Sequence, residues 1–482
     1  MFDLRPVVNV VGLLLAVLGA TMLLPAWMDW RDGNGHAGVF VESAFLTILV
    51  GGTLWLATQN ARRRGLSLQQ TFVLTTGVWV VLPIFGAIPF VLGATNAGFT
   101  DAFFESMSGL TTTGATVFTG LDDLPRGVLL WRGMLQWLGG VGIIVVAMVF
   151  LPELRVGGMQ IFKSEGFDTL GKILPRATQI ASQIAWLYLG LTIACGVGYV
   201  AAGLGMFEAG VHAMTTIATG GFSSRDTSFA ALGAQAEYTS ILFMILAALP
   251  FVRYVQLLNG DTRPIFRDTQ ILVFLAIVAV FACVVALWLN TTQYFGLEYS
   301  LRKALFNGVS IITGTGYASA DYNAWGGFVL VLFFYAGLVG GCAGSTSCSV
   351  KVFRYQLLFS AIKMQVRRIF MPSGVFTTKY QGQKVGDDVL GSVLSFFVVF
   401  FLTLAVLAVG LATTGLDWTT AISGAAAALA NIGPGLGDII GPAGNYATLN
   451  APAKWLLIAG MLVGRLELMA VYILFTLRFW RN

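Results

Sequence analysis

The chain has 482 residues, of which 56% are hydrophobic and only 11% are charged. A soluble chain of this length would form two or three domains with charged surfaces. Here the charges fall in short connectors between apolar runs of about 20 residues, which match the thickness of a bilayer. The composition excludes a soluble globular protein and predicts a polytopic membrane protein. The net charge of +5 needs no nucleic acid to explain it, because cytoplasmic loops that face anionic lipid account for a basic excess.

Ten apolar segments are long enough to cross a membrane. In chain order they are residues 7–28, 38–58, 71–94, 127–151, 180–204, 238–258, 270–291, 325–350, 389–413 and 453–478. Four shorter stretches are predicted to be helical but too short to span, and each lies between two spans: 101–112, 207–218, 298–312 and 417–430. The predicted fold class is therefore an all-α membrane protein with about ten spans and four re-entrant helices.

The basic residues predict the orientation of these spans. Most of the 28 lysine and arginine residues fall in connectors on one side, and both termini lie on that side. Because basic connectors are retained in the cytoplasm, both termini are predicted to be cytoplasmic. The four short helices then enter the membrane from the outside.

A polar loop that contains glycine follows each short helix. The four loops read TTTGAT, ATGGFS, TGTGYA and NIGPGL, and they align on Gly114, Gly220, Gly316 and Gly433. This repetition predicts four degenerate copies of one unit: span, short helix, glycine loop, span. The predicted division is two extra N-terminal helices in 1–66, followed by repeats at 67–160, 175–262, 268–370 and 385–482.

The chemistry of these loops suits a cation. Unpaired backbone carbonyls are tolerated at membrane depth only inside protein or along a water-filled path. Four loops around one axis would present carbonyl oxygens that replace the hydration shell of an ion, and each short helix would point its partially negative C-terminal end at the cavity. For one loop alone, glycine packing between helices is the better explanation. Four copies on one predicted face favour a pore.

Acidic residues stand near the start of each short helix. They are Asp101, Glu208, Glu298 and Asp417. A carboxylate at a helix N-terminus is stabilised by the helix dipole. We therefore predict a structural role for these acids in preference to ion binding.

Arg465 is predicted to be the sole basic residue deep in a span. It lies roughly 18 Å from either end of the last predicted helix, so its side chain cannot readily reach an interface. A buried charge at that depth is a functional candidate. The alternative is an ion pair with Glu467, but residues two apart on a helix point to different faces.

The eighth predicted span is interrupted by GLVGGCAGSTSCS, residues 337–349. Two glycine pairs with the spacing of small-residue packing, Gly337 with Gly341 and Gly340 with Gly344, support an intact helix. The serine, threonine and cysteine cluster that follows them lowers helix propensity over several residues. Both interpretations, packing and an unwound loop, stay open on these grounds.

Seven motifs together resemble the TrkH type of the Trk/Ktr/HKT potassium transporters. They are FFESMSGLTTTGAT, LLWRGMLQWLGGVGI, LPELRVGGMQ, TIATGGFS, GGCAGSTS, NIGPGLG and VGRLE, and they cover essentially the whole chain. The resemblance implies two extra N-terminal helices, four pseudo-symmetric membrane-pore-membrane units and a homodimer with one pore per subunit. It also implies potassium uptake across the bacterial inner membrane and a cytoplasmic TrkA-type ring partner that binds adenine nucleotides. The chain itself contains no Walker sequence.

The same resemblance implies the site residues. The K⁺ filter maps onto Thr112, Thr113 and Gly114; Ala218, Thr219 and Gly220; Gly314, Thr315 and Gly316; and Asn431, Ile432 and Gly433. A gating loop under the filter would include Gly340, Gly341, Gly344, Ser345 and Thr346, with Arg465 opposing a resident cation. The four filter loops are unequal, so looser selectivity is expected than in a tetrameric channel. A serine marks the sodium-preferring plant relatives at the first filter glycine, and here that position is Gly114.

Two other classes of function are weaker. An intramembrane enzyme would need paired catalytic acids or a nucleophile with its base inside the spans, and none is evident in the sequence. A proton-coupled symporter would need a titratable group along the path. Glu467 is the one evident candidate for it, so symport remains the alternative to gated, channel-like conduction.

Overall fold

The protein is described by a computed structural model that covers residues 3–60, 66–146, 157–159 and 177–481. The regular secondary structure of its described residues is helical apart from one two-stranded antiparallel hairpin, in which β1 (Lys379–Tyr380) pairs with β2 (Gln383–Lys384). The all-α prediction is confirmed. The end of the predicted span 127–151 and the boundary between the predicted first and second repeats lie outside the described residues.

The ten predicted spans are present in three forms among the described residues. Seven helices are long and apolar enough to cross a membrane, and two more spans are each a bent pair of helices. The tenth is the short helix α17 (Gly327–Gly337), which ends where the sequence predicts an interruption. The chain is thus a multi-pass membrane protein.

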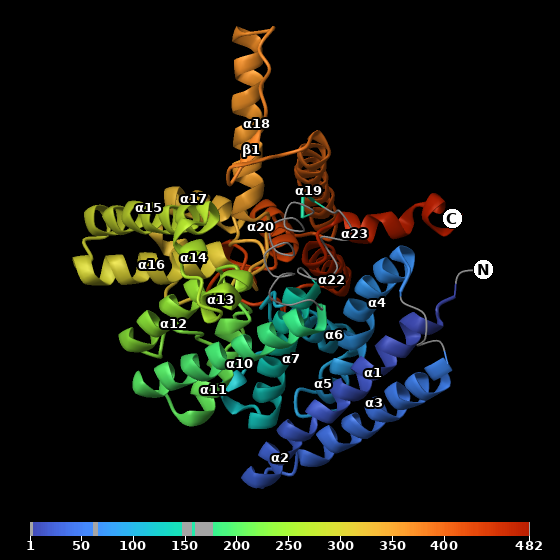
Figure 1. The fold of residues 1–482 in the computed structure, drawn as a ribbon. Coiled ribbons are helices and arrows are strands. Elements are labelled where there is room, and N and C mark those ends of the chain that lie inside the picture. Colours follow the sequence, from blue (N-terminus) through green and yellow to red (C-terminus); the bar gives the residue numbers. More distant parts are fainter. Residues whose placement is uncertain (1–2, 61–65, 147–156, 160–176, 482) are drawn as a thin grey trace.

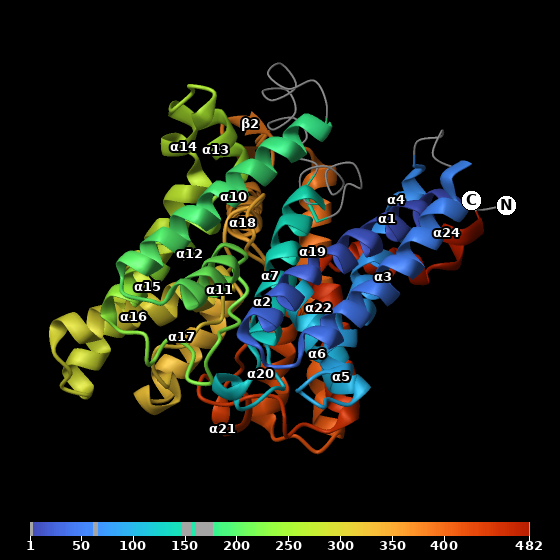
Figure 2. The ribbon, with the colours of Figure 1, turned by 90° about the horizontal axis from the view of Figure 1, so that it is seen from below.

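Two N-terminal helices lie side by side outside the four units that follow (Figure 2). They are α1 (Arg5–Thr21), which α2 (Leu23–Asp32) continues, and α3 (Ala37–Ala57). Their backbones approach closely at Gly12 and Gly51, since a Cβ atom added to Gly12 would lie 2.8 Å from the Gly51 carbonyl oxygen. Small residues at such a crossing are the usual device for helix association in a membrane.

The remaining helices form four units around a common centre (Figure 1). The first contains α4 (Leu68–Gly86), α5 (Ile88–Leu92), α6 (Phe99–Leu110), η2 (Leu121–Asp123) and α7 (Arg126–Val145). The second contains α10 (Ala177–Ala201), α11 (Met206–Ile217), α12 (Ala234–Ala247) and α13 (Phe251–Leu258). The third contains α14 (Arg263–Arg267), α15 (Thr269–Thr292), α16 (Leu297–Thr313), η4 (Tyr322–Trp325), α17 and α18 (Val352–Phe370). The fourth contains α19 (Asp387–Thr413), α20 (Trp418–Ala430), α21 (Gly437–Ile440), α22 (Ala451–Arg465), α23 (Met469–Tyr472), η5 (Ile473–Phe475) and α24 (Leu477–Arg481).

The short helices α6, α11, α16 and α20 begin at the acids that the sequence singles out. Asp101, Glu208 and Glu298 lie in the first turns of their helices, and Asp417 caps α20 by accepting the Thr420 N–H at 3.1 Å. The first three also form ion pairs with Lys454, Arg225 and Arg302. Their predicted structural role at the helix starts is confirmed, because the negative charge sits at the positive end of each helix dipole.

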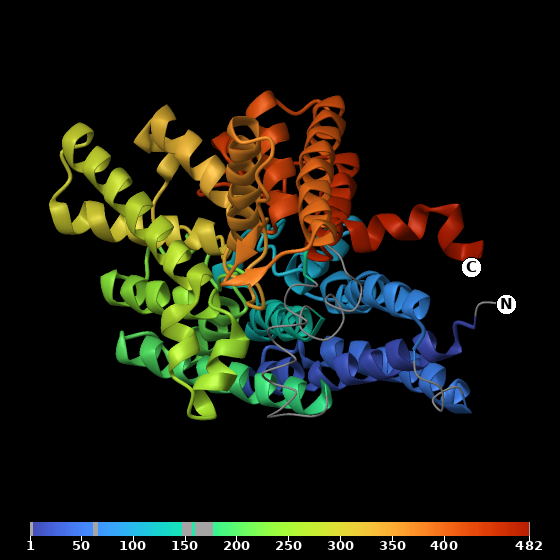
Figure 3. The same cartoon turned by 45° about the horizontal axis from the view of Figure 1, so that its top comes forward.

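Two predicted continuous spans are broken, which corrects the expectation for 238–258 and 453–478. The axes of α12 and α13 differ by 87°, and those of α22 and the α23–η5 segment by 105°. Pro250 explains the first break, because proline cannot continue the helix that precedes it. At the second break Glu467 and Leu468 have positive φ values of 61° and 50°. Figure 3 shows α24 leaving the bundle beyond this second break.

The two ends of the described chain are anchored at the same place. The side chain of Gln70 donates to the Asp3 carbonyl oxygen at 2.7 Å, and that of Gln69 donates to the Phe479 carbonyl oxygen at 2.8 Å. Both glutamines lie in the first turn of α4. The N-terminal and C-terminal segments therefore meet at one end of the helical bundle.

Candidate ion pathway

The loops after the four short helices share one backbone pattern. In each, the first and third residues have positive φ while the middle residue does not, and the positive values range from 49° to 99°. These pairs are Thr112 and Gly114, Thr219 and Gly221, Gly314 and Gly316, and Asn431 and Gly433. Alternating handedness turns successive carbonyls toward one side, whereas an extended strand alternates them. Glycine at the third position meets this requirement at little steric cost.

Backbone hydrogen bonds show the same correspondence among the four loops. The middle residue of each loop donates its N–H to the carbonyl five residues earlier, at 2.8 to 3.0 Å: Thr113 to Ser108, Gly220 to Thr215, Thr315 to Ser310 and Ile432 to Ala427. We call the four segments Thr112–Gly114, Thr219–Gly221, Gly314–Gly316 and Asn431–Gly433 the filter ring, after the role that is predicted for these loops from the sequence.

The filter ring closes on itself. A Cβ atom added to Gly114 would collide with the Gly220 carbonyl oxygen, one on Gly221 with that of Thr315, and one on Gly316 with that of Ile432. One on Gly433 would lie 2.8 Å from the Thr113 carbonyl oxygen, which returns to the first loop. Each third-position glycine therefore abuts the middle carbonyl of the next segment in cyclic order.

This geometry corrects the alignment of the second loop by one residue. The sequence alignment places Ala218, Thr219 and Gly220 opposite Thr112, Thr113 and Gly114. In the structure Ala218 is the C-cap of α11 with an ordinary φ of −71°, and Gly221 occupies the position of Gly114. The second loop has two adjacent glycines, and only backbone geometry shows which of them takes the left-handed conformation.

A cavity of about 340 Å³ adjoins the filter ring on the side of its third-position glycines. Gly114, Gly221, Gly316 and Gly433 all line it. Charged side chains in its wall are Arg132, Arg225 and Asp226. The third-position glycines of all four segments thus face one polar vestibule.

Two buried oxygens of the filter ring have no hydrogen-bond partner among the described residues. They are Thr112 Oγ1 and Asn431 Oδ1, and both belong to first-position residues. The amide nitrogen of Asn431 donates to Thr113 Oγ1 and to the Met461 carbonyl oxygen, both at 2.9 Å, which orients the side chain. Unpaired buried oxygens are costly, and a dehydrated cation is one group that would satisfy them.

Side chains that the sequence analysis did not single out support the ring. Gln136 Nε2 donates to the Gly220 carbonyl oxygen at 2.5 Å, while its Oε1 accepts the Phe222 N–H at 3.0 Å. The hydroxyl of Tyr446 donates to the Gly433 carbonyl oxygen at 2.6 Å. The amide of Gln136 thereby holds the middle of the second segment and the residue that follows it. Gln136 is a polar residue inside the predicted span 127–151, and this is the feature of the sequence that could have identified it.

A buried ion pair links the first two loops. Arg132 Nε donates to Glu105 Oε1 at 2.8 Å, and Arg132 Nη1 donates to the Ser223 carbonyl oxygen at 2.8 Å. Glu105 Oε2 accepts the Val117 N–H at 2.8 Å. Arg132 lies within α7 and is 1% exposed, so Arg465 is not the only basic residue that is buried inside a predicted span. Its neighbouring charges made Arg132 look like part of an outer connector.

Residues 338–351, between α17 and α18, form an irregular segment that we call the inner loop. The predicted interruption of the eighth span is confirmed. The Cys342 N–H donates to the Ala248 carbonyl oxygen at 3.0 Å, and the Phe251 N–H donates to that of Gly344 at 2.9 Å, so the loop occupies the break between α12 and α13. Ser347 Oγ donates to the Thr313 carbonyl oxygen at 2.6 Å, directly before the third filter segment.

Arg465 is the last residue of α22 and contacts the inner loop. Its guanidinium donates to the Thr346 carbonyl oxygen at 3.5 Å, to Cys348 Sγ, and to the Gly139 carbonyl oxygen at 3.2 Å. Within the described ranges no carboxylate pairs with it. It is 2% exposed, so its positive charge is buried without a compensating negative charge.

Glu467 pairs with other cations. Its two carboxylate oxygens accept from Lys351 Nζ, at 2.9 Å, and from Arg354 Nη2. Lys351 ends the inner loop and Arg354 lies in the first turn of α18. The break after α22 is therefore tied to the junction between the inner loop and α18.

Comparisons with known proteins give a consistent result. The family model for TrkH, described as a cation transport protein, matches residues 36–480. The chain is 43% identical to the Trk system potassium uptake protein TrkI of Halomonas elongata, over 99% of this chain and 97% of the relative. It is 37% identical to the Trk system potassium uptake protein TrkH of Salmonella typhimurium, over 99% of each chain. The crystal structure of the potassium transporter TrkH from Vibrio parahaemolyticus matches with a TM-score of 0.92 at 35% identity, covering 100% of both chains. The chain therefore belongs to the TrkH family of cation transport proteins.

Proposed function

We propose that this chain is the pore-forming subunit of a Trk-type potassium uptake system and conducts K⁺ through the filter ring. The observation that carries the proposal is the cyclic contact of the four segments, in which alternating φ signs turn carbonyls toward one axis. Carbonyl oxygens that replace the hydration shell are the means by which potassium filters dehydrate the ion. The printed names of the relatives, as potassium uptake proteins, support the choice of ion.

The proposed filter residues are the twelve of the filter ring, with Gly221 in place of Ala218. Thr112 Oγ1 and Asn431 Oδ1 add two side-chain oxygens at the inner end. The segments differ in sequence, so the ring is less regular than that of a tetrameric channel. We expect discrimination between K⁺ and Na⁺ to be correspondingly weaker.

The proposed gate is the inner loop together with Arg465. Gly340 and Gly344 have positive φ values of 77° and 73°, and the loop lacks the intrahelical bonds that hold a span rigid. Such a segment can shift when its bonds to the break between α12 and α13 are released. The unpaired charge of Arg465 would repel a cation that leaves the filter until the loop shifts.

The surroundings of the pore are proposed as follows. The protein lies in a bacterial inner membrane with both termini cytoplasmic, which the basic connectors and the shared anchoring of the two ends on α4 support. It forms a homodimer with one pore per subunit. A cytoplasmic TrkA-type ring that binds nucleotides gates it through α18, and the chain itself binds no nucleotide. The four repeats divide at the boundaries predicted from the sequence.

The test is flux of ⁸⁶Rb⁺ or K⁺ into proteoliposomes that contain this chain alone, with and without the ring protein. We expect cation flux that is selective for K⁺ over Na⁺ and that increases when the ring and its nucleotide are added. Proteoliposomes that show no K⁺ flux under either condition, with protein that elutes as a folded species, would refute the proposal.

Proton-coupled symport is the alternative, and reversal potentials at two pH values separate it from conduction. A shift with the proton gradient would support symport. Glu467, its sole evident candidate from sequence, is held between two cations, an arrangement that favours a fixed ionised carboxylate over a proton carrier. We therefore expect reversal potentials that follow the K⁺ gradient alone.

A further inference from the structure

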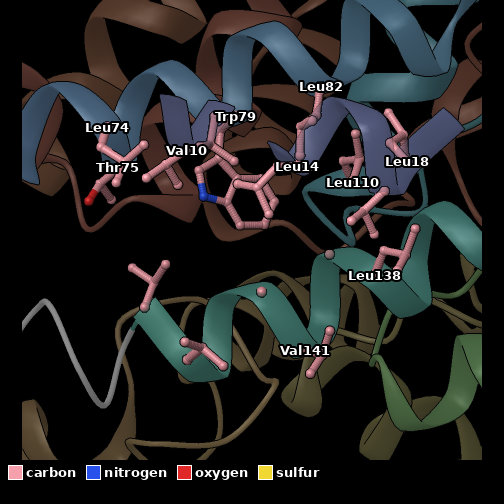
Figure 4. Close-up of a pocket in the computed structure, with 16 residues that line it drawn as sticks. Val10, Leu14, Leu18, Leu74, Thr75, Trp79, Leu82, Leu110, Leu138 and Val141 are labelled. Atoms are coloured by element: carbon pink, nitrogen blue, oxygen red, sulfur yellow. The ribbon is translucent and has the colours of Figure 1, made fainter. Parts of the chain in front are cut away.

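A pocket of about 400 Å³ lies between α1, α4 and α7 (Figure 4). We propose that it is a binding site for one acyl chain of a membrane phospholipid. The walls are residues of three membrane-spanning helices, and the inner end is Leu110, the last residue of α6. No charged side chain is among its lining residues.

The lining suits hydrocarbon and excludes water. Figure 4 shows apolar side chains of α1 and α4 on one side of the pocket and Leu138 of α7 on the other, with the ring of Trp79 between them. Thr75 contributes a hydroxyl, but it donates to the Thr71 carbonyl oxygen at 2.7 Å. A water molecule needs two to four polar partners to remain in a cavity. An apolar occupant is therefore favoured over solvent.

The pocket is continuous with the lipid-facing surface, which identifies the source of the occupant. Val17 lines the pocket and is 50% exposed, and its neighbour Leu13 on α1 is 41% exposed. In a membrane protein such surfaces are covered by acyl chains. The volume of about 400 Å³ is many times the roughly 30 Å³ that one water molecule occupies in the liquid, so it can hold a stretch of acyl chain. A helix of a second copy, about 10 Å across with its side chains, is too thick.

The position of the pocket along the helices identifies the leaflet. Its lining extends from Val10 on α1 and Val146 at the end of α7 toward Leu110. With the proposed cytoplasmic termini, this is the cytoplasmic half of the membrane. The occupant is therefore a chain of a lipid in the cytoplasmic leaflet, with its terminal methyl group near α6.

The walls of this site are shared with Arg465. The Trp79 ring centroid lies 5.5 Å from Arg465 Cζ, and the Gly139 carbonyl oxygen accepts from Arg465. Gly139 also packs directly on the Leu110 carbonyl, one residue before the first loop. An acyl chain in the pocket would support both residues from the side opposite to the ion pathway.

The test is photolabelling of the full chain in proteoliposomes of phosphatidylethanolamine and phosphatidylglycerol. The probe is phosphatidylglycerol with a diazirine midway along one acyl chain, and adducts are mapped by mass spectrometry. We expect adducts on α4 between Leu74 and Leu82 and on α7 between Leu138 and Val146, as well as on lipid-facing helices. Labelling of lipid-facing helices without labelling of these two segments would refute the site.

Gly142→Leu is the decisive variant. Gly142 lines the pocket, and an added Cβ would meet only Trp79, at 3.8 Å, so the leucine fills the space without a collision at its base. The matched control is Gly77→Leu on α4, where an added Cβ has no neighbour within 4 Å and the residue does not line the pocket. We expect the pocket adducts to be lost in Gly142→Leu and retained in Gly77→Leu.

Unchanged pocket adducts in Gly142→Leu would overturn the proposal. Leucine also improves helix propensity over glycine, which favours folding of both variants. If Gly142→Leu does not elute as a folded species, Val145→Phe fills the same pocket from α7 and carries the same expectation. None of these readouts depends on ion conduction, so the site can fail while the proposed function stands, and the reverse also holds.

Discussion

A side chain at the third position of each filter segment would displace the carbonyl of the next segment. We predict that Gly114→Ser, Gly221→Ser and Gly316→Ser lower the selectivity for K⁺ over Na⁺, because each residue has a φ of 78° to 84° and abuts a carbonyl oxygen. A loss of about 1.4 kcal/mol of preference lowers the selectivity ratio roughly tenfold. Bi-ionic potentials in proteoliposomes measure this ratio.

The matched control for these three variants is Gly120→Ser. Gly120 has a φ of 68° but lies in an exposed loop with no atom within 4 Å of an added Cβ. The Gly120→Ser variant therefore has the backbone strain of the ring variants without the collision. Its selectivity for K⁺ over Na⁺ should match that of the wild type. Unchanged potentials in all three ring variants would show that these glycines do not form the filter. An unchanged potential in Gly221→Ser alone would reject the corrected alignment.

Arg465 differs from the other buried cations in what surrounds its charge. Arg132, Lys303 and Arg354 each pair with a carboxylate, whereas the guanidinium of Arg465 contacts two carbonyls and a thiol. We predict that Arg465→Ala raises cation flux. A unit charge about 8 Å from an ion, at an effective dielectric constant of about 20, contributes about 2 kcal/mol, which corresponds to roughly a 30-fold change in rate.

Arg132→Ala is the contrasting variant. Its removal leaves the carboxylate of Glu105 buried without a positive charge beside it, which costs about 3–5 kcal/mol of stability. We therefore expect a lower thermal midpoint and no gain in flux for Arg132→Ala, whereas Arg465→Ala should gain flux without a lower thermal midpoint. Lower flux in Arg465→Ala, with normal elution and an unchanged thermal midpoint, would show that Arg465 is a structural residue.

The residue types of the four glycine loops could be read from the sequence, but the alignment of the second loop could not. Two adjacent glycines satisfy the same pattern, and the choice of Gly221 depends on the contact between Gly221 and Thr315. The Arg132 and Glu105 pair was missed for a similar reason. Each residue alone reads as part of an outer connector or a short helix, and only folding brings them within 2.8 Å.

Among the elements, breaks in the helices were predictable where the chain carries a chemical signal. Glycines and small polar residues mark the inner loop, and Pro250 marks the bend after α12, although the sequence analysis treated that span as continuous. The bend after Arg465 has no such signal. Glu467 and Leu468 adopt positive φ, and ion pairs from Glu467 to Lys351 and Arg354 offset the strain. Those partners lie more than a hundred residues away in sequence.

Shortening the inner loop is predicted to increase cation flux. Removing Gly340 to Gly344 deletes the backbone bond from Cys342 to Ala248 and that from Phe251 to Gly344. We expect flux in the absence of the ring protein to increase while the ratio of K⁺ to Na⁺ permeability stays unchanged, because the filter ring lies outside the deletion. Flux and bi-ionic potentials of the same preparation measure both quantities.

A milder variant controls for misfolding of the deletion. Gln270 Oε1 accepts the Ala343 N–H at 3.0 Å, so Gln270→Met loosens the loop without shortening the chain. Its flux should lie between those of the wild type and the deletion. If both proteins fold but neither conducts more than the wild type without the ring, the inner loop is a packing element and does not form the gate.

Helix α18 projects out of the helical bundle. Figure 1 shows it projecting beyond the other helices. Phe359, Ile362, Val366 and Ile369 are 66%, 49%, 46% and 68% exposed, and their spacing places them on one face of the helix. An exposed apolar stripe of this kind marks a surface that binds another protein or the membrane. Arg354, in the first turn of α18, pairs with Glu467, so force applied to this helix reaches the inner loop.

We predict that Ile362→Ser combined with Ile369→Ser abolishes the stimulation of flux by the TrkA-type ring and its nucleotide. Flux through the chain alone and its selectivity should remain unchanged, because the stripe touches neither the filter ring nor Arg465. The control is Val406→Ser, which exchanges a 65% exposed apolar residue on the lipid-facing helix α19. Undiminished stimulation in the double variant would show that the ring acts elsewhere. If light scattering then finds a monomer in place of a dimer, the stripe joins two copies of this chain instead.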